Sequence, residues 1–182
     1  MSFIKYQRNK LLIKKYYKKT GWDIFMPTRF VDYFNEYNMW IDKVNLPKDL
    51  KILDIGSDYG SLYHYLKYKG FNIIEYNPYD YSIFKPFTTD NINEFYNDYN
   101  FIKMDCEGCE FEIFKYIDLS KILDKTLVIA IHENEKYDFN IAHKIVETCP
   151  HLIFRVGNEF LYTNKVKGSK EWKIQWKSSH IF

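Results

Sequence analysis

A predicted strand that leads into a glycine-bounded turn and then into a helix is the feature that most constrains the fold. Residues 51–55 form an apolar run that ends at Gly56. The turn extends to Gly60, and residues 61–69 then have helical spacing up to Gly70. Glycine permits a tight turn and lets a ligand approach the backbone, although such turns are common in α/β folds. The GxxxG spacing disfavours a dinucleotide site and suits a cofactor whose amino-acid end lies over the turn.

Further along the chain, predicted strands alternate with predicted helices. The other strands fall at residues 71–76, 101–104, 127–132, 151–156 and 159–163, and the helices at 110–116 and 140–149. This alternation predicts a mostly parallel twisted sheet with helices on both faces. Gly157 and Asn158 join the last two strands as a tight hairpin, so the final strand should be antiparallel. The expected fold class is therefore α/β, a Rossmann-like sheet with the C-terminal hairpin of class I methyltransferases.

The two ends of the chain differ from its middle in charge and pattern. Residues 1–50 are expected to be a helical N-terminal extension, with one helix over 3–19 and a second that Thr28 caps. Residues 51–164 would form the methyltransferase-like domain, and residues 165–182 a basic tail. Basic ends around an acidic middle indicate contact with a polyanion, unless they form only a solvated surface.

Several classes of protein are disfavoured by what the chain lacks. It contains no run of about 18 apolar residues, so no membrane-spanning helix is expected. The first residues lack the apolar core and cleavage site of a signal peptide, so the expected location is the cytoplasm.

The cysteines are few. Cys106 and Cys109 form a CxxC pair, which raises a redox or zinc hypothesis, and Cys149 stands alone. No second pair of zinc ligands follows, and an odd number of cysteines argues against a disulfide framework. We therefore expect Cys106 and Cys109 to be small buried residues without chemistry, and the sequence assigns no metal ligand.

Acidic side chains follow two of the predicted strands. Glu75 is placed at the end of the second strand, where a carboxylate can accept hydrogen bonds from both hydroxyls of an adenosine ribose. Asp105 and Glu107 follow the strand at 101–104 and, with Glu110, put three acids within six residues. Carboxylates at the carboxyl end of a parallel strand face the ligand crevice. The alternative is that Asp105 and Glu107 only cap the next helix.

Three segments, KILDIGSDYGSL, EYNP and IKMDCEGCEFEIFK, together resemble the FkbM-type methyltransferases over roughly residues 50–164. The third segment is the most specific of them. The resemblance implies S-adenosylmethionine (SAM) as cofactor. It also implies that Glu75 binds the ribose and that Asp105 and Glu107 line the transfer site. The residues that would hold or shape the methionine end of SAM are Asp54, Gly56, Asp58 and Gly60.

His132 and Glu133 follow the most apolar strand and would face the same crevice. A neutral His132 is a candidate general base, or else a strand-end histidine that only forms hydrogen bonds. The resemblance implies an O-methyltransferase acting on a hydroxyl of a sugar, a glycan or a small metabolite. The alternatives are a catalytically silent SAM-fold binding module and an RNA methyltransferase that holds phosphates with the basic ends. The chain between Glu75 and Lys103 is short, so the part of the pocket that covers adenine is expected to be trimmed.

Overall fold

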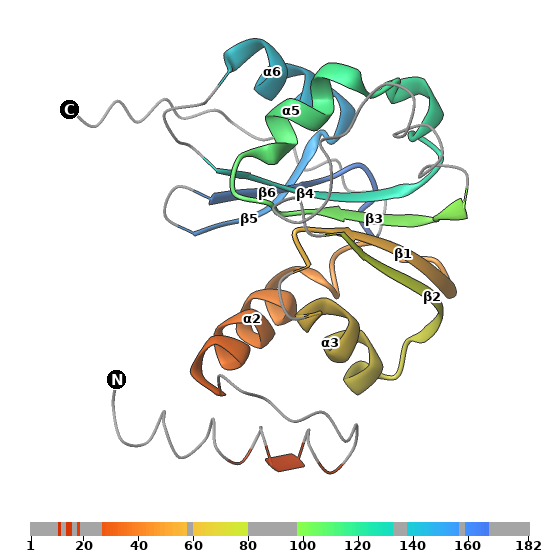
Figure 1. Ribbon diagram of the computed structural model, residues 1–182, viewed down its shortest axis with the longest axis vertical. Helices are drawn as coiled ribbons and strands as arrows, with labels where there is room; N and C mark the ends of the chain where they lie inside the picture. Colours follow the sequence, from red (N-terminus) through yellow and green to blue (C-terminus); the bar gives the residue numbers. More distant parts are fainter. Residues whose placement is uncertain are drawn as a thin grey trace, which may run out of the picture.

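A computed structural model describes most of the chain (Figure 1). The described residues are 27–57, 60–79, 98–132, 138–156 and 159–167, together with Leu11, Lys14, Lys15 and Lys18. Most of the helix predicted over residues 3–19 therefore lies outside them, as do most of the chain between Glu75 and Lys103 and most residues of the two basic ends.

The described strands form one six-stranded sheet in the order β2-β1-β3-β4-β6-β5. Their bounds are β1 Asp49–Ile55, β2 Asn72–Tyr79, β3 Phe101–Met104, β4 Thr126–His132, β5 His151–Val156 and β6 Glu159–Thr163. Strand β1 is parallel to β2 and β3, and β3 is parallel to β4. Strand β6 is antiparallel to both of its neighbours, β4 and β5. Gly157 and Asn158, the predicted hairpin turn, lie outside the described residues.

Two helices cover each face of the sheet (Figure 1). Helices α2 (Pro27–Trp40) and α3 (Ser61–Lys69) lie on one face, and α5 (Cys109–Tyr116) and α6 (Phe139–Thr148) lie on the other. A short 3₁₀ helix, η1 (Leu119–Lys121), precedes β4. The fold is therefore mixed α/β. Within the described part of the chain, no helix combines the length and apolar character needed to cross a membrane.

Each face has its own apolar core. Tyr37, Trp40 and Ile41 from α2 and its end pack with Leu62 and Leu66 of α3 under one face of the sheet. Because their side chains are almost fully buried, α2 is a structural part of the sheet's cover. The opposite core contains residues from α5 and α6, among them Phe111, Phe114, Ile141 and Ile145.

Two predicted element boundaries were wrong. Helix α2 begins at Pro27, so Thr28 lies inside the first turn; proline is favoured there because its fixed φ suits a helix start. Strand β2 does not stop before Asn77 and Pro78 but continues to Tyr79. Among the described strands β2 pairs only with β1, and a strand with one neighbour tolerates proline, which lacks an N–H donor.

Candidate functional site

The parallel strands β1, β3 and β4 bring their carboxyl ends to one edge of the sheet. Gly56 follows β1 and Asp105 follows β3, and the Asp105 amide donates a hydrogen bond to the Ile55 carbonyl at 2.9 Å. Gly56 has a φ of +76°, and a Cβ there would lie 1.8 Å from the Asp105 carbonyl oxygen. The glycine turn and the acidic loop are therefore in direct contact, and only glycine fits between them.

Lys103 of β3 lies at the centre of this edge and is almost completely buried. Its Nζ is 3.3 Å from Asp54 Oδ1 and 3.4 Å from Asp105 Oδ2. Burial opposes the charge of Lys103, but Asp54 and Asp105 outweigh it and raise the lysine pKa well above its ordinary value. The second oxygen of Asp54 accepts a hydrogen bond from the Tyr76 hydroxyl at 2.7 Å. Asp54 thus holds protein groups with both oxygens, which agrees with a role in shaping the turn.

His132, at the end of β4, is surrounded by three carboxylates. Its Nε2 lies 3.7 Å from Asp105 Oδ1 and 3.9 Å from Glu107 Oε2, and its Nδ1 lies 3.6 Å from Glu110 Oε1. Contact with Glu110 is the largest cause that raises the His132 pKa, to about 9; Asp105 and Glu107 add to it and burial opposes it. The three carboxylates therefore favour the charged imidazole. A protonated His132 cannot accept a proton, so the raised pKa argues against a neutral general base, and a catalytic role of His132 stays a prediction.

A second acidic group combines Glu36 of α2, Asp105 and Glu159 of β6, whose ligand atoms lie within 4.8 Å of one another. Burial, reinforced by the charge of Asp105, raises the Glu36 pKa to about 8. The same two causes raise the pKa of Glu159. Glu36 is therefore largely protonated at neutral pH and can donate a hydrogen bond.

A groove of about 380 Å³ opens beside this group. Its walls come from α2, β5 and β6. The lining residues are Asp32, Tyr33, Asn35, Glu36, Met39, Phe154 and Glu159.

The described residues offer three groups that could hold a metal ion. They are Asp105 with Glu107 and His132, Glu36 with Asp105 and Glu159, and Cys106 with Cys109 and Glu110. Metal binding would require the deprotonated forms of His132 and Glu36, whose pKa values are raised in the metal-free protein.

The glycine turn fits the amino-acid end of SAM. Gly60 immediately precedes α3, has a φ of +69° and makes no side-chain cap, so the first amides of α3 can bind a carboxylate. Among the described residues, a Cβ at Gly60 would meet no atom closer than the Tyr76 hydroxyl at 3.8 Å, so these residues leave space beside the backbone. Asp58, the remaining predicted residue of the turn, lies outside the described residues, as does Glu133.

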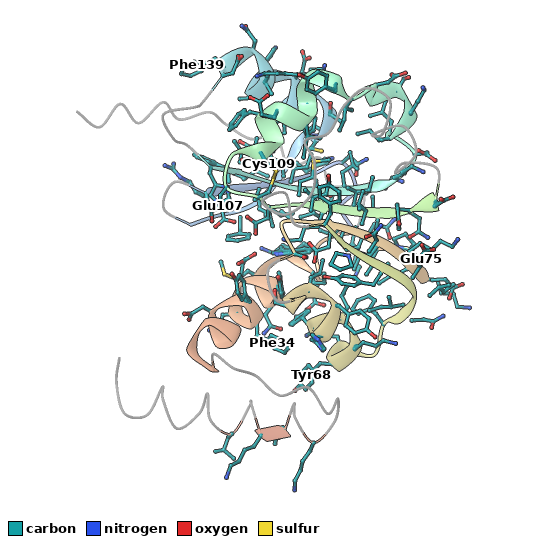
Figure 2. All side chains as sticks on the ribbon, viewed as in Figure 1. Phe34, Tyr68, Glu75, Glu107, Cys109 and Phe139 are labelled. Carbon is teal, nitrogen blue, oxygen red and sulfur yellow. A yellow bond between two sulfur atoms is a disulfide. The ribbon has the colours of Figure 1, made fainter. Side chains whose placement is uncertain are left out.

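Glu75 does not lie at this edge, contrary to its predicted position at the end of β2. It is paired in register with Lys51, and their side chains, each nearly half exposed, approach to 3.9 Å. Strand β2 ends four residues later at Tyr79, about 13 Å further at ~3.3 Å per residue. Figure 2 shows Glu75 well separated from Glu107. Glu75 therefore lies short of the edge that carries the glycine turn, and its role in binding a ribose stays a prediction.

Cys106 and Cys109 are joined by a disulfide bond, so the expectation of two unlinked cysteines was wrong. A closed pair at this spacing needs no wider framework, which is why the odd number of cysteines misled the prediction.

Sequence reasoning also assigned no role to Lys103, Glu110 or Glu36. Lys103 had a readable signal, since it is a charged residue inside an apolar strand. Glu36 had a weaker signal, because it lies at helical spacing from Tyr33 and Trp40 on the inward side of α2.

Comparison with known proteins gives one match. The family model described as Methyltransferase FkbM domain matches residues 31–160, more than half of the chain. No curated protein and no solved structure matches the chain significantly. The matched range starts inside α2 and ends in β6, so it includes the glycine turn, the acidic loop and the groove. The chain therefore belongs to the FkbM methyltransferase domain family.

Proposed function

We propose that this methyltransferase moves a methyl group from SAM to a hydroxyl of a sugar, a glycan or a small metabolite. The observation that carries the proposal is the position of Asp105. Its backbone touches the glycine turn at Gly56, and its carboxylate belongs to the acidic group with Glu36 and Glu159 beside the groove. One residue thus joins the region that suits a cofactor to the region that suits an acceptor.

On this proposal the turn from Gly56 to Gly60 and the N-terminus of α3 hold the methionine end of SAM. When bound, SAM supplies an electrophilic methyl group on a sulfonium. The acidic edge favours that positive charge. The order of the sheet strands and the antiparallel β6 support a Rossmann-like class I architecture.

The chain's own residues would position the acceptor. Lys103 fixes one oxygen of Asp105, and protonated His132 lies near the other. Asp105 is thereby held in one orientation, from which it accepts the hydrogen bond, and then the proton, of the acceptor hydroxyl. Glu36, largely protonated, donates a hydrogen bond to a second acceptor oxygen. Most of the rate enhancement would come from this positioning.

The charge of the groove also ranks the alternatives. Its described lining includes the acidic residues Asp32, Glu36 and Glu159 but no lysine or arginine, so it offers no cation to a phosphate-rich acceptor. An RNA acceptor is therefore less favoured than a polyhydroxylated one. Contact of the basic ends with a polyanion stays a prediction.

The test has two stages. Calorimetric titration with SAM and with its demethylated product measures cofactor binding, and radiolabelled SAM with a panel of sugars, glycans and hydroxylated metabolites measures transfer. Asp105→Asn should lower the free energy of unfolding, because Lys103 loses one of its two carboxylates, but the protein should stay folded because Asp54 remains paired with Lys103. It should leave SAM affinity nearly unchanged and slow transfer at least about 100-fold, because a positioned proton acceptor is lost.

Asp124→Asn is the matched control, since Asp124 is exposed at the opposite end of β4. Wild-type rates in both variants would give Asp105 a structural role only, as a partner of Lys103. SAM binding without transfer to any member of the panel would support the silent binding module.

A further inference from the structure

The disulfide between Cys106 and Cys109 is a reactive group that methyl transfer does not use. The two Cα atoms are 5.3 Å apart, and Cys109 is the first residue of α5. The remaining cysteine, Cys149, is buried and unlinked. The pair therefore closes a short loop at the helix start, next to the acidic edge of the sheet.

The two cysteine residues differ in their exposure to solvent. Cys109 is buried, with 6% of its surface exposed, whereas Cys106 is only partly buried. An external thiol can therefore reach Cys106 first. The sulfur that leaves would be that of Cys109, at the N-terminus of a helix, where the backbone amides stabilise a thiolate. Exposure and helix position thus assign different roles to the two cysteines.

The surroundings also suit the reduced pair. Glu110 is completely buried, and its Oε2 lies 3.5 Å from Cys106 Sγ while accepting the Gly108 amide at 3.0 Å. A free Cys106 thiol would therefore find a hydrogen-bond acceptor already in place. Glu110 keeps the Gly108 amide as a partner in the disulfide state and can also accept from Cys106 in the dithiol state, so its surroundings suit both states.

We propose that Cys106 and Cys109 form a reversible thiol–disulfide exchange site for small thiols, with Cys106 as the sulfur that reacts with the external partner. In reduction, a small thiolate attacks Cys106 Sγ, the bond between the two protein sulfurs breaks, and Cys109 leaves. A second small thiol cleaves the mixed disulfide and releases Cys106. Two electrons and two protons pass from two small thiols to the two cysteines, and one small disulfide forms.

The first test is a redox titration of the folded full chain in mixtures of reduced and oxidised dithiothreitol. Samples are quenched with acid and alkylated in denaturant. Cleavage after lysine and arginine places Cys106 and Cys109 on the peptide 104–115 and Cys149 on the peptide 145–155. The second peptide is always alkylated, so it normalises the first.

We expect the alkylated fraction of the first peptide to rise from about one-tenth to about nine-tenths over a roughly 80-fold change in the ratio of reductant to oxidant, as for a single two-electron couple. A disulfide that persists until the chain is unfolded would show a permanent cross-link. A pair that stays alkylated at every ratio would show that no exchange site exists. Either result overturns the proposal, and neither depends on methyl transfer.

The second test assigns the two roles. Cys109→Ser leaves Cys106 alone, and oxidised glutathione should then form a stable mixed disulfide on it. Cys106→Ser leaves the buried Cys109, which should form at least about tenfold less adduct in the same time. Equal adducts, or more adduct on Cys109, would contradict the assignment. Circular dichroism confirms that each variant is folded, and the wild-type titration stands if one is not.

Discussion

Lys103→Met should destabilise the protein far more than the same change at Lys51. Lys103 is buried between Asp54 and Asp105, at 3.3 and 3.4 Å. Its removal leaves two neighbouring carboxylates without their cation, and losing one partner of a buried ion pair costs about 3–5 kcal/mol. Lys51 also faces an acid across the strands, but that pair is about half exposed and 3.9 Å apart. Such surface pairs contribute about 0–1 kcal/mol.

Urea unfolding followed by circular dichroism measures both variants against the wild type. At a slope of about 2 kcal/mol per molar urea, a loss of 4 kcal/mol lowers the midpoint by about 2 M, whereas Lys51→Met should lower it by less than about 0.5 M. The double variant Lys103→Met with Asp54→Asn should regain part of the loss, since one uncompensated charge is removed. Equal losses for the two lysines would refute the buried ion cluster.

Three further predictions concern the same edge. Gly56→Ala should lower the free energy of unfolding by about 2–4 kcal/mol, because a left-handed φ and a severe clash with the backbone combine. Gly70 has a φ of +90° and no described atom within 4 Å of an added Cβ, so Gly70→Ala should lower the free energy of unfolding by only about 1–2 kcal/mol. Equal losses would contradict the close contact at Gly56. The His132 pKa, measured by NMR, should be near 9 and fall towards 6.5 in Glu110→Gln. The stability that this histidine contributes is complete below pH 6.5 and is lost as the pH rises through 9. A wild-type titration midpoint near 6.5 would refute the effect of the three surrounding carboxylates. The folded pKa of Glu36 is raised from 4.5 to about 8, so its contribution to the free energy of unfolding falls as the pH rises through that window. Urea unfolding at several pH values should show the wild type losing up to about 1.4 kcal/mol per pH unit relative to Glu36→Gln. Parallel plots of the free energy of unfolding against pH would show that Glu36 has an ordinary pKa.

The local parts of the fold could be predicted because short-range chemistry specifies them. Helix α3 has its predicted bounds, since Gly60 and Gly70 stand at its two ends in left-handed conformations. The apolar runs of β1, β3 and β4 likewise mark buried strands. Each of these signals lies within about ten residues of the element it specifies.

The parts that failed depend on pairing between distant segments. Where Glu75 lies relative to the sheet edge is decided by the register between β2 and β1, and no local residue encodes that register. The group of Glu36, Asp105 and Glu159 joins α2, the loop after β3 and β6. Its altered acidities arise only when the three acids become neighbours, which a reading of separate motifs cannot show.

The burial of α2 limits how far the chain can be shortened from its N-terminus. Tyr37 and Trp40 fill the core beneath β1 and β4, and the Tyr37 hydroxyl is hydrogen-bonded to Ser61 Oγ at 2.7 Å. Val44 forms a β-bridge with Val166, so the segments that flank the sheet hold each other in place. A truncation at residue 50 would remove one of the two described helices that cover this face of the sheet and would delete the Glu36 wall of the groove. A folding unit therefore needs at least the chain from α2 to about residue 167, which extends beyond both ends of the family match.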